Sequence, residues 1–313
     1  MTGVSYVFTV YNKVPFLPRV VAGLARQAGD FAREYIFVDD GSTDDSAGLL
    51  EELTKTMVTP TTKVVIHRQA NAGPATALNK GLALATHDYV KLMDADDILV
   101  PEATTALLQA LSYQHAVLVI GRDGLYDPSD AAELPTDIGV RRSGEITVVD
   151  HPLNKVVKRA YFNPSCILGR REDFLRAGGS DERVFIQDYS LALRLARLGK
   201  FVELDKTIYL SPQIAADRLS DNGAQILHDL NLSLGLFLQD QPGLSPQFIK
   251  AAAYRATSRA WKWARREQGA SLFSQYHRLL ISSLFAPPSK GAALCLTSCG
   301  SFQESGRVRR LQQ

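Results

Sequence analysis

Short apolar runs alternate with two-faced segments along the first 120 residues of the chain. The runs are rich in β-branched and aromatic side chains, which is typical of buried strands. The predicted strands are Val4–Val10, Tyr35–Val38, Val64–His67, Tyr89–Met93 and Val117–Ile120. The segments between them have helical character, and Pro74 and Pro101 suit the first turns of two predicted helices. Strand–helix alternation of this kind predicts a parallel sheet covered by helices on both faces.

The rest of the chain changes character twice. Between residues 123 and 149 the pattern weakens into polar turns, and it resumes with helices near Glu172–Ala177 and Gln187–Leu198. After residue 221 the sequence is mostly helical, and Gln247–Glu267 has separate apolar and basic faces. The stretch Ala286–Gly291 is typical of a linker and predicts a disordered tail after it. We therefore expect one α/β domain over residues 1–220 and a helical C-terminal region over 221–313.

Two acidic clusters follow predicted strands, at the strand ends where sheets of this kind bind ligands. Phe37–Asp44 and Leu92–Asp97 each place carboxylates just after an apolar run. Such carboxylates accept hydrogen bonds from a base or ribose, or bind Mg²⁺ or Mn²⁺ together with substrate phosphates. The alternative is that these side chains cap helices and fill turns. The equivalent positions of Asp40 and Asp96 favour a diphosphate–metal site for these two.

The distribution of charge adds one expectation. The formal net charge of the chain is only +2, which by itself says little about partners. We expect no nucleic-acid partner. Residues 221–313, however, hold eleven Lys and Arg residues against five Asp and Glu residues, which favours contact with an anionic surface. The basic face of Gln247–Glu267 predicts either peripheral contact with anionic lipid, with Trp261 and Trp263 near the interface, or a solvated face on a packed helix.

The sequence carries no sign of export or membrane insertion. No basic segment followed by an apolar core opens the chain, and no apolar run approaches the roughly 18 residues that span a bilayer. Three cysteines do not make a disulfide framework. We expect a cytoplasmic protein, with any peripheral contact at the inner face of the membrane.

Six motifs of the chain resemble those of the family 2 glycosyltransferases with the GT-A fold. They are Ser5–Asn12, Val38–Asp44, Asn71–Leu82, Tyr89–Asp97, Ala177–Asp181 and Gln187–Leu191. One such motif alone is weak evidence, whereas their shared order and spacing over about residues 4–200 are specific. The resemblance implies a Rossmann-like mixed sheet with flanking helices. In the expected 1–220 domain, the resemblance makes residues 1–100 the nucleotide-binding half and residues 101–220 the acceptor and catalytic half.

The resemblance also implies roles for residues near the nucleotide. Thr9 and Tyr11 match positions that line the nucleotide pocket, the tyrosine by packing on the base. A core aromatic is the alternative for Tyr11. Asp40, with Asp39 as its neighbouring candidate, matches the carboxylate that hydrogen-bonds the base. The Asn71–Leu82 segment matches one that closes over the nucleotide, without roles for its individual residues.

Asp94-Ala-Asp96 matches the Asp-x-Asp motif of the family. The resemblance implies that Asp94 lies near the ribose and that Asp96 ligates the Mg²⁺ or Mn²⁺ that bridges the two phosphates. Asp188 matches the catalytic base, which takes the proton of the acceptor hydroxyl as its oxygen attacks the anomeric carbon. The alternative is that Asp188 only stabilises the N-terminus of its helix through the helix dipole.

Two departures from the family pattern concern the metal and the base. Gln187 stands where the family usually has Glu, which makes the surroundings of Asp188 less negative without removing the base. Many relatives also place a His downstream of the base, and Tyr209–Arg218 contains none. Gln213 and Arg218 are the candidates to reach the diphosphate in its place, so the full coordination shell of the metal stays open.

The sequence therefore predicts an inverting, metal-dependent glycosyltransferase. Its donor is a nucleotide-diphosphate sugar, most readily a UDP-sugar, and its acceptor is a hydroxyl of a glycan or a lipid-linked acceptor in surface polysaccharide or lipid-linked glycan synthesis. One alternative is a catalytically degenerate relative that binds nucleotide or glycan. A second is a sugar-phosphate nucleotidyltransferase, whose Gly-rich phosphate loop after the first strand is lacking in Thr9–Lys13.

Overall fold

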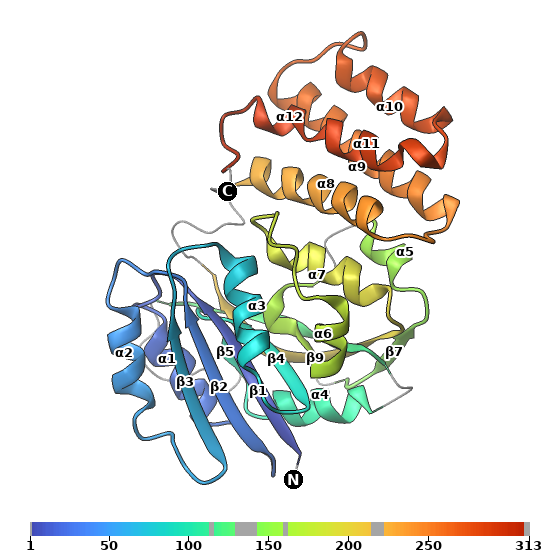
Figure 1. Ribbon diagram of the computed structural model, residues 1–313. Coiled ribbons are helices and arrows are strands. Elements are labelled where there is room, and N and C mark those ends of the chain that lie inside the picture. The colour runs from blue at the N-terminus through green and yellow to red at the C-terminus, as the bar shows by residue number, and fades with distance from the viewer. Residues whose placement is uncertain (1, 113–115, 129–142, 159–161, 214–221, 310–313) are drawn as a thin grey trace. The chain divides into compact units, whose positions relative to one another are not determined.

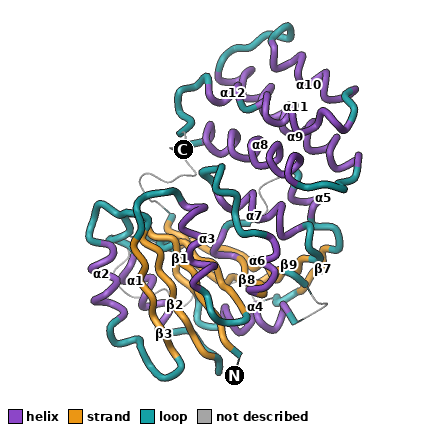
Figure 2. Tube along the Cα trace, in the orientation of Figure 1, coloured by secondary structure: helices purple, strands orange, loops and turns teal. Residues whose placement is uncertain are grey.

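The computed structural model describes residues 2–112, 116–128, 143–158, 162–213 and 222–309. Its largest feature is a mixed sheet (Figures 1 and 2). The nine described strands follow the order β3-β2-β1-β4-β8-β6-β9-β5, and β7 pairs with β9. The strands are β1 (Gly3–Val10), β2 (Ala32–Asp39), β3 (Thr62–Arg68), β4 (Tyr89–Asp94), β5 (Ile98–Leu99), β6 (Leu118–Tyr126), β7 (Ile146–Val149), β8 (Ile167–Arg170) and β9 (Phe201–Pro212). Neighbours from β3 to β4 run parallel, whereas β8 is antiparallel to both β4 and β6.

Helices pack directly on this sheet. Those in the same compact unit are α1 (Leu17–Ala25), α2 (Ser46–Thr54), α3 (Pro74–Leu84), α4 (Ala103–Leu111) and α6 (Arg171–Ala177). α3 contacts β1 and β2, and α4 contacts β6, β8 and β9. Strand β1 is buried over almost its whole length, as expected for a central parallel strand. Gly81 allows α3 to approach this closely, because a Cβ there would lie 2.2 Å from Cγ1 of Val7.

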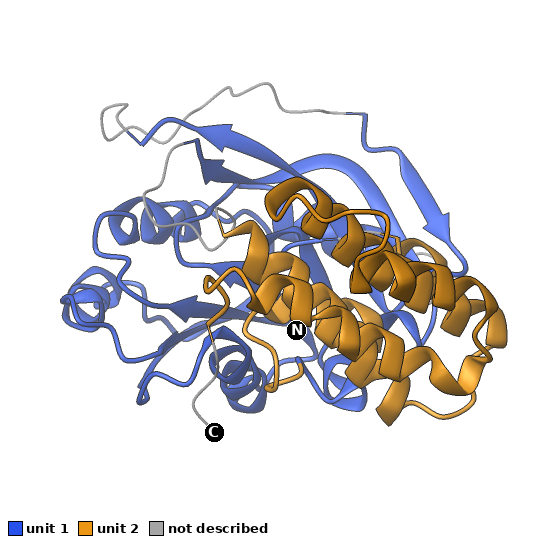
Figure 3. Cartoon of the chain, turned by 90° about the horizontal axis from the view of Figure 1, so that it is seen from above, with its two compact units in different colours: residues 1–152, 162–180, 195–216 blue, residues 153–161, 181–194, 217–313 orange. Residues whose placement is uncertain are grey.

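A second compact unit is almost entirely helical, and Figure 3 colours the two units separately. It comprises residues 153–161, 181–194 and 217–313. Its helices are α5 (Leu153–Val156), the start of α7 (Gln187–Ala196), α8 (Gly223–Asp240), α9 (Pro246–Glu267), α10 (Gln275–Phe285), the 3₁₀ turn η4 (Pro288–Lys290), α11 (Gly291–Ser298) and α12 (Gly300–Gln303). Side chains cap three of them, since Asn222, Ser245 and Ser274 each accept a hydrogen bond from a first-turn amide.

The five predicted strands are confirmed as β1, β2, β3, β4 and β6, and the mixed sheet implied by the resemblance is confirmed as well. The sequence pattern had not predicted β9, the longest described strand, although it pairs with β5, β6 and β7. The expected domain boundary at residue 220 stays a prediction. The contact units differ from it in grouping residues 153–161 and 181–194 with the C-terminal helices.

In the C-terminal region, the expected disordered tail was wrong, and so was the position of two tryptophans in the lipid-contact alternative. Residues 291–303 form helices instead of a disordered tail, because Cys295, Cys299 and Phe302 are buried against the helices of their own unit. Trp261 and Trp263 are also buried, in a core cluster with Phe302, so neither ring is available to a lipid interface. Within the described ranges, no helix has both the length and the apolar character needed to cross a membrane.

Candidate functional site

The register of three parallel strands brings both acidic clusters to one edge of the sheet. On one side of β1, Val10 pairs with Asp39 of β2, and on its other side Thr9 pairs with Asp94 of β4. Since the carboxyl ends of parallel strands share an edge, the carboxylates after β2 and β4 flank the end of β1. The predicted nucleotide residues of the first hundred positions therefore lie together in the structure.

The loops that follow β1 and β2 are tied to each other by hydrogen bonds. The backbone of Asn12 is left-handed, with a φ of 53°, and its amide donates to Oγ of Ser42 at 3.0 Å. Its side-chain Oδ1 accepts from the amide of Thr43 at 2.8 Å, and the amide of Lys13 donates to Oγ of Ser46 at 2.8 Å. This network fixes the backbone on the C-terminal side of Tyr11. The tyrosine is 46% exposed, which excludes the core-aromatic alternative and leaves its ring free to stack on a base.

Asp40 organises the segment that opens α3. Its Oδ1 accepts from the amide of Ala72 at 2.9 Å and from Nε2 of Gln69 at 2.8 Å, while its Oδ2 accepts from the amide of Gly73 at 2.8 Å. Both carboxylate oxygens thus hold the start of the Asn71–Leu82 motif. A nucleobase that binds Asp40 would have to share the carboxylate oxygens with these donors. The sequence alone did not indicate this.

Asp39 is buried beneath an exposed arginine. Its Oδ1 accepts from the amide of Ser42 at 3.0 Å and also from the hydroxyl of that serine. Its Oδ2 forms an ion pair with Nε of Arg68 at 3.2 Å and, among the described residues, accepts no hydrogen bond. This oxygen therefore keeps an unused acceptor position at the edge where the nucleotide residues meet.

The cluster after β4 concentrates negative charge. Burial, and after it the charges of Asp94 and Asp96, raise the pKa of Asp97 well above its usual range. The amide of Asp94 donates to Oγ of Ser165 at 2.9 Å, which anchors the motif to the 3₁₀ turn η2 (Pro164–Cys166). Asp96 forms an ion pair with Lys13, whose Nζ lies 2.5 Å from its Oδ2.

A buried lysine lies beneath this cluster. Lys91 of β4 is fully buried, and its Nζ donates to the carbonyls of Leu92 at 2.8 Å and Ser165 at 2.5 Å. Burial lowers the pKa of Lys91 to about 7, against the opposing effect of Cys166 and the nearby aspartates. Neither Lys91 nor Lys13 was identified from the sequence. A lysine within an apolar strand, and a lysine directly after the first motif, were the available signals.

The residues of this edge fit a divalent cation. Mg²⁺ and Mn²⁺ are bound by one or two carboxylates together with substrate phosphates, so a larger protein cage is not required. In the described part of the chain no group of three or more His, Cys, Asp or Glu side chains forms such a cage. Asp96, on the other hand, already attracts the ammonium group of Lys13. A cation bound there would use Asp96 and the diphosphate, with Asp94 beside them.

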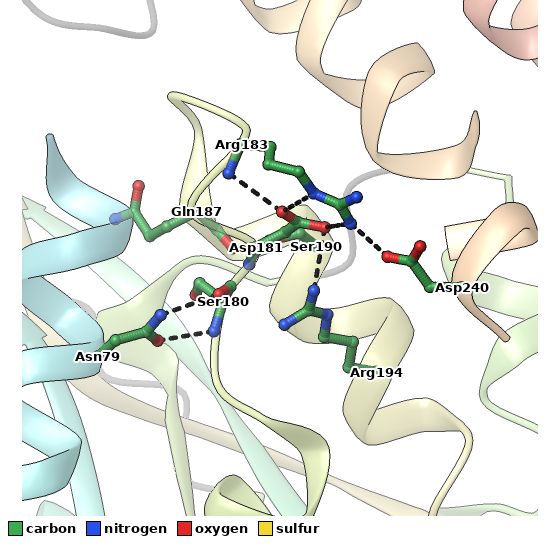
Figure 4. Close-up of polar contacts among 8 residues, drawn as sticks. All are labelled: Asn79, Ser180, Asp181, Arg183, Gln187, Ser190, Arg194 and Asp240. Atoms are coloured by element: carbon green, nitrogen blue, oxygen red, sulfur yellow. Dashed lines mark hydrogen bonds and ion pairs between the residues drawn. The ribbon is translucent and has the colours of Figure 1, made fainter. Parts of the chain in front are cut away.

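The Asn71–Leu82 and Ala177–Asp181 motifs contact each other through residues that had no individual role assigned. Nδ2 of Asn79 donates to the carbonyl of Ser180 at 2.9 Å, and the amide of Ser180 donates to Oδ1 of Asn79 at 2.8 Å (Figure 4). Gly179 has a φ of +65°, and a Cβ there would lie 2.2 Å from Oδ1 of Asn79. The contact therefore requires glycine at this position and ties α3 to the segment after α6.

Asp188 lies in the first turn of α7 and is partly buried. Its Oδ1 accepts from the amide of Tyr189 at 2.7 Å. Burial raises its pKa to about 6. The amides of Tyr189 and of Asp188 itself oppose this shift, and the charge of Asp229 adds to it. A carboxylate with this pKa is a stronger base than an ordinary aspartate and still loses its proton at neutral pH.

The segment before α7 is held by an ion-pair network. Asp181 accepts from Nε and Nη2 of Arg183 at 2.8 and 2.6 Å and from Nη2 of Arg194 at 2.9 Å (Figure 4). Its amide donates to Oγ of Ser190 at 3.0 Å. Arg183 also forms an ion pair with Asp240 at the end of α8. These contacts give the Asp181 motif a structural role that the sequence did not reveal.

Of the two candidates for the missing histidine, only Gln213 lies among the described residues. Its amide donates to the carbonyl of Tyr126 at 2.8 Å, and its side chain is exposed. Arg218 lies outside the described residues. The expected substitute for the downstream histidine therefore stays a prediction.

Comparisons with known sequences agree on one family. The profile of glycosyl transferase family 2 matches residues 5–176. The glycosyltransferase GlyG of Streptococcus pneumoniae is 27% identical over 213 residues, which cover 66% of this chain and 69% of GlyG. The amylovoran biosynthesis glycosyltransferase AmsE of Erwinia amylovora is 26% identical over 199 residues, which cover 62% of this chain and 70% of AmsE.

Solved structures agree on the fold. Residues 1–349 of S. aureus TarS, crystallised with UDP-GlcNAc, match with a TM-score of 0.62 at 15% identity, covering 98% of this chain and 92% of that one. The mannosyltransferase PcManGT of Pyrobaculum calidifontis, in complex with GDP-Man and Mn²⁺, matches with a TM-score of 0.57 at 18% identity, covering 97% and 85%. At these identities the likeness shows the fold alone, and it confirms the GT-A fold.

Proposed function

The chain belongs to glycosyl transferase family 2 and is a glycosyltransferase, and we propose that it transfers a sugar with inversion from a UDP-sugar to an acceptor hydroxyl. The observation that carries the proposal is the meeting of Thr9, Asp39 and Asp94 at one edge of the sheet. Donor, stereochemistry and metal dependence are parts of the proposal. UDP is favoured by the TarS complex with UDP-GlcNAc, whereas the PcManGT complex with GDP-Man makes GDP the competing choice.

The edge geometry supports the nucleotide-binding roles that we propose. Tyr11, exposed on a fixed backbone, stacks on the base, and Asp39 and Asp40 accept its hydrogen bonds. Asp94 binds the ribose beside the end of β1. Asp96 would hold Mg²⁺ or Mn²⁺, and the cation would supply Lewis-acid stabilisation to the departing diphosphate.

Asp188 is the general base of the proposed reaction. It takes the proton of the acceptor hydroxyl while that oxygen bonds to the anomeric carbon and the bond from this carbon to the diphosphate breaks. The nucleoside diphosphate leaves with the bonding electrons, and the transition state resembles an oxocarbenium ion. The pKa of about 6 suits this role, since Asp188 is ionised at neutral pH yet basic enough to accept the proton.

The acceptor belongs to surface polysaccharide or lipid-linked glycan synthesis. The similarity to an amylovoran biosynthesis glycosyltransferase supports this class. The exposed basic residues of α9, among them Arg255, Lys262 and Arg266, support peripheral contact with an anionic membrane surface. Since both tryptophans of α9 are buried, this contact rests on charge.

Calorimetric binding of UDP, GDP and dTDP, each with Mn²⁺ and with EDTA, tests the proposal. We expect UDP to bind in Mn²⁺ and to lose most of its affinity in EDTA. Tighter metal-dependent binding of GDP or dTDP would replace UDP as the donor nucleotide. If the folded protein binds none of the three, the proposed donor site is refuted and a degenerate glycan-binding relative becomes the better description.

A further inference from the structure

A buried carboxylate of α8 holds the backbone that leads into α7. Oδ2 of Asp229 accepts hydrogen bonds from the amide of Phe185 at 3.0 Å and from the amide of Ile186 at 2.8 Å. These are the two residues directly before α7, and Asp188 is the second residue of that helix. The contact joins sequence positions more than forty apart within one compact unit.

The other carboxylate oxygen of Asp229 also has two partners. Its Oδ1 contacts Nδ1 of His228 at 2.7 Å and accepts from Nε2 of Gln225 at 3.1 Å. Nε2 of His228 in turn lies 3.1 Å from Nε2 of Gln303 in α12. Asp229 is 2% exposed, so four contacts hold a carboxylate that water scarcely reaches. A side chain held in this way is well suited to set the position of the backbone that it binds.

We infer that Asp229 is a positioning residue for transfer, which holds the start of α7 so that Asp188 is presented to the acceptor and which keeps a negative charge near that base. The inference rests on the proposed role of Asp188. The carboxylate that holds the segment before Asp188 belongs to α8. The inference therefore gives the C-terminal helices a part in the chemical step.

The charge of Asp229 adds to the effect of burial on the pKa of Asp188, which stands at about 6. The titratable groups around Asp229 are His228 on its own helix and Cys299 at the end of α11. Two arginines contact the segment around Asp188. Arg309 lies 5.6 Å from the ring of Phe185, and Arg259 of α9 lies 5.9 Å from the ring of Tyr189. Among the groups that shift the pKa of Asp188, only Asp229 is a second negative charge.

The negative charge of Asp229 determines in which direction the pH dependence of transfer changes when Asp229 is replaced. The base works without its proton, so transfer rises with pH through the pKa of Asp188 and falls as the pH drops below it. A nearby negative charge favours the protonated form of Asp188 and raises this pKa. Removal of the charge of Asp229 therefore moves the acid limb of the pH–rate profile to lower pH.

The test compares Asp229→Asn, Asp229→Glu and the control Asp240→Asn in the 313-residue chain. Asp240 also holds the segment before α7, through Arg183, but it is not among the groups that shift the pKa of Asp188. Asp229→Asn should lower kcat by about 10- to 100-fold through misplacement of the base and shift the acid limb to lower pH. Asp229→Glu keeps the charge but lengthens the side chain. Its kcat should therefore fall, while the acid limb should stay in place. Asp240→Asn should keep the acid limb at its wild-type position, whatever its effect on kcat, because Asp240 does not shift the pKa of Asp188.

Affinity for the donor nucleotide separates positioning from general damage. All three variants should bind UDP in Mn²⁺ as tightly as the wild type, because neither Asp229 nor Asp240 belongs to the strands and loops that form the nucleotide edge. Unchanged kcat and an unchanged acid limb in Asp229→Asn would overturn the inference, as would a joint loss of kcat and UDP affinity. If Asp229→Asn does not fold, an unchanged kcat of Asp229→Glu is the contradicting result. Full transfer by Asp188→Asn would instead refute the proposed base, whatever the Asp229 variants do.

Discussion

The Nζ of Lys13 lies 2.5 Å from Oδ2 of Asp96, so the proposed metal ligand already holds a cation of the protein. The backbone of Lys13 is fixed by the hydrogen bond from its amide to Ser46, and its ammonium group also lies 5.4 Å from the ring of Phe16. The side chains of Lys13 and Asp96 are 26% and 14% exposed, which leaves the pair partly shielded from water. A divalent cation that binds Asp96 has to compete with this lysine.

Lys13→Met should raise the affinity for Mn²⁺ in the absence of nucleotide. A partly exposed ion pair contributes about 1 kcal/mol or less, so the dissociation constant should fall by roughly two- to fivefold. Electron paramagnetic resonance of free Mn²⁺ during a titration measures it directly. Lys55→Met, which removes an exposed lysine at the end of α2, is the control and should leave the affinity unchanged. An equal affinity in Lys13→Met and wild type contradicts the competition.

Asp96→Ala should remove the metal dependence of nucleotide binding. With Asp96 absent, affinity for UDP in Mn²⁺ should fall to the value that the wild type has in EDTA, since the cation loses its protein ligand. Calorimetry in both buffers measures the two values. Asp45→Ala, which removes an exposed aspartate before α2, should bind like the wild type. Retention of the full Mn²⁺ effect by Asp96→Ala would move the metal site elsewhere.

Asp188→Asn should abolish transfer and leave UDP binding nearly intact. The substitution keeps the size of the side chain and removes the base, which contributes about 10²- to 10⁴-fold to the rate. In the wild type, transfer should fall as the pH is lowered through about 6, because the base, with its raised pKa, becomes protonated there. A radiochemical transfer assay between pH 5 and 8 measures both effects. Normal turnover of the variant rules out Asp188 as the base.

Gly179→Ala should destabilise the protein more than Gly144→Ala. Both glycines have left-handed backbones, with φ values of +65° and +62°. A Cβ at position 179 would collide with Asn79, whereas a Cβ at position 144 meets nothing within 4 Å. Backbone strain costs each variant about 1–2 kcal/mol, and the collision adds to the loss at position 179 only. Urea unfolding measures the difference. Equal midpoints would show that the Asn79 side chain moves aside for the added Cβ without loss of stability.

Charge removal on α9 should weaken binding to anionic vesicles. We expect sedimentation with vesicles of phosphatidylserine and phosphatidylcholine at low salt, and none with phosphatidylcholine alone. Replacement of Arg255, Lys262 and Arg266 by Gln should lower this partition by about tenfold or more, because each basic residue near the surface contributes about 1 kcal/mol. The control replaces Arg26 and Lys55, which are exposed in the other unit. Identical partition of the two variants would argue against a role for α9.

Local pattern was sufficient for the nucleotide half of the fold. β1, β2 and β4 are short apolar runs, and burial of such runs depends on residue type within a few positions. The carboxylates after β2 and β4 were identified for the same reason, as polar residues at the ends of buried strands. Their meeting beside β1 then follows from parallel pairing, which the alternation of strands and helices had predicted.

Elements without such a local signal were missed or misinterpreted. β9 mixes charged and apolar residues, and it is a strand because it pairs with three others. The helices after residue 290 follow a linker-like stretch, and their apolar residues are buried only because α8 and α9 supply the other half of the core. The tryptophans of α9 suit a lipid interface as well as a core, and only packing against Phe302 decides between the two.

The sequence by itself determined the family, the strand ends and the identity of the acidic residues, since these depend on residue types at fixed spacing along the chain. Tertiary structure alone decided which partners those residues have. Lys13 contacts Asp96, and Asp229 holds the amides of Phe185 and Ile186. Backbone donors are the same at every residue, and a lysine can pair with any carboxylate within its reach. Contacts of this kind therefore leave no pattern in the sequence and exist only once the folded chain sets the distances.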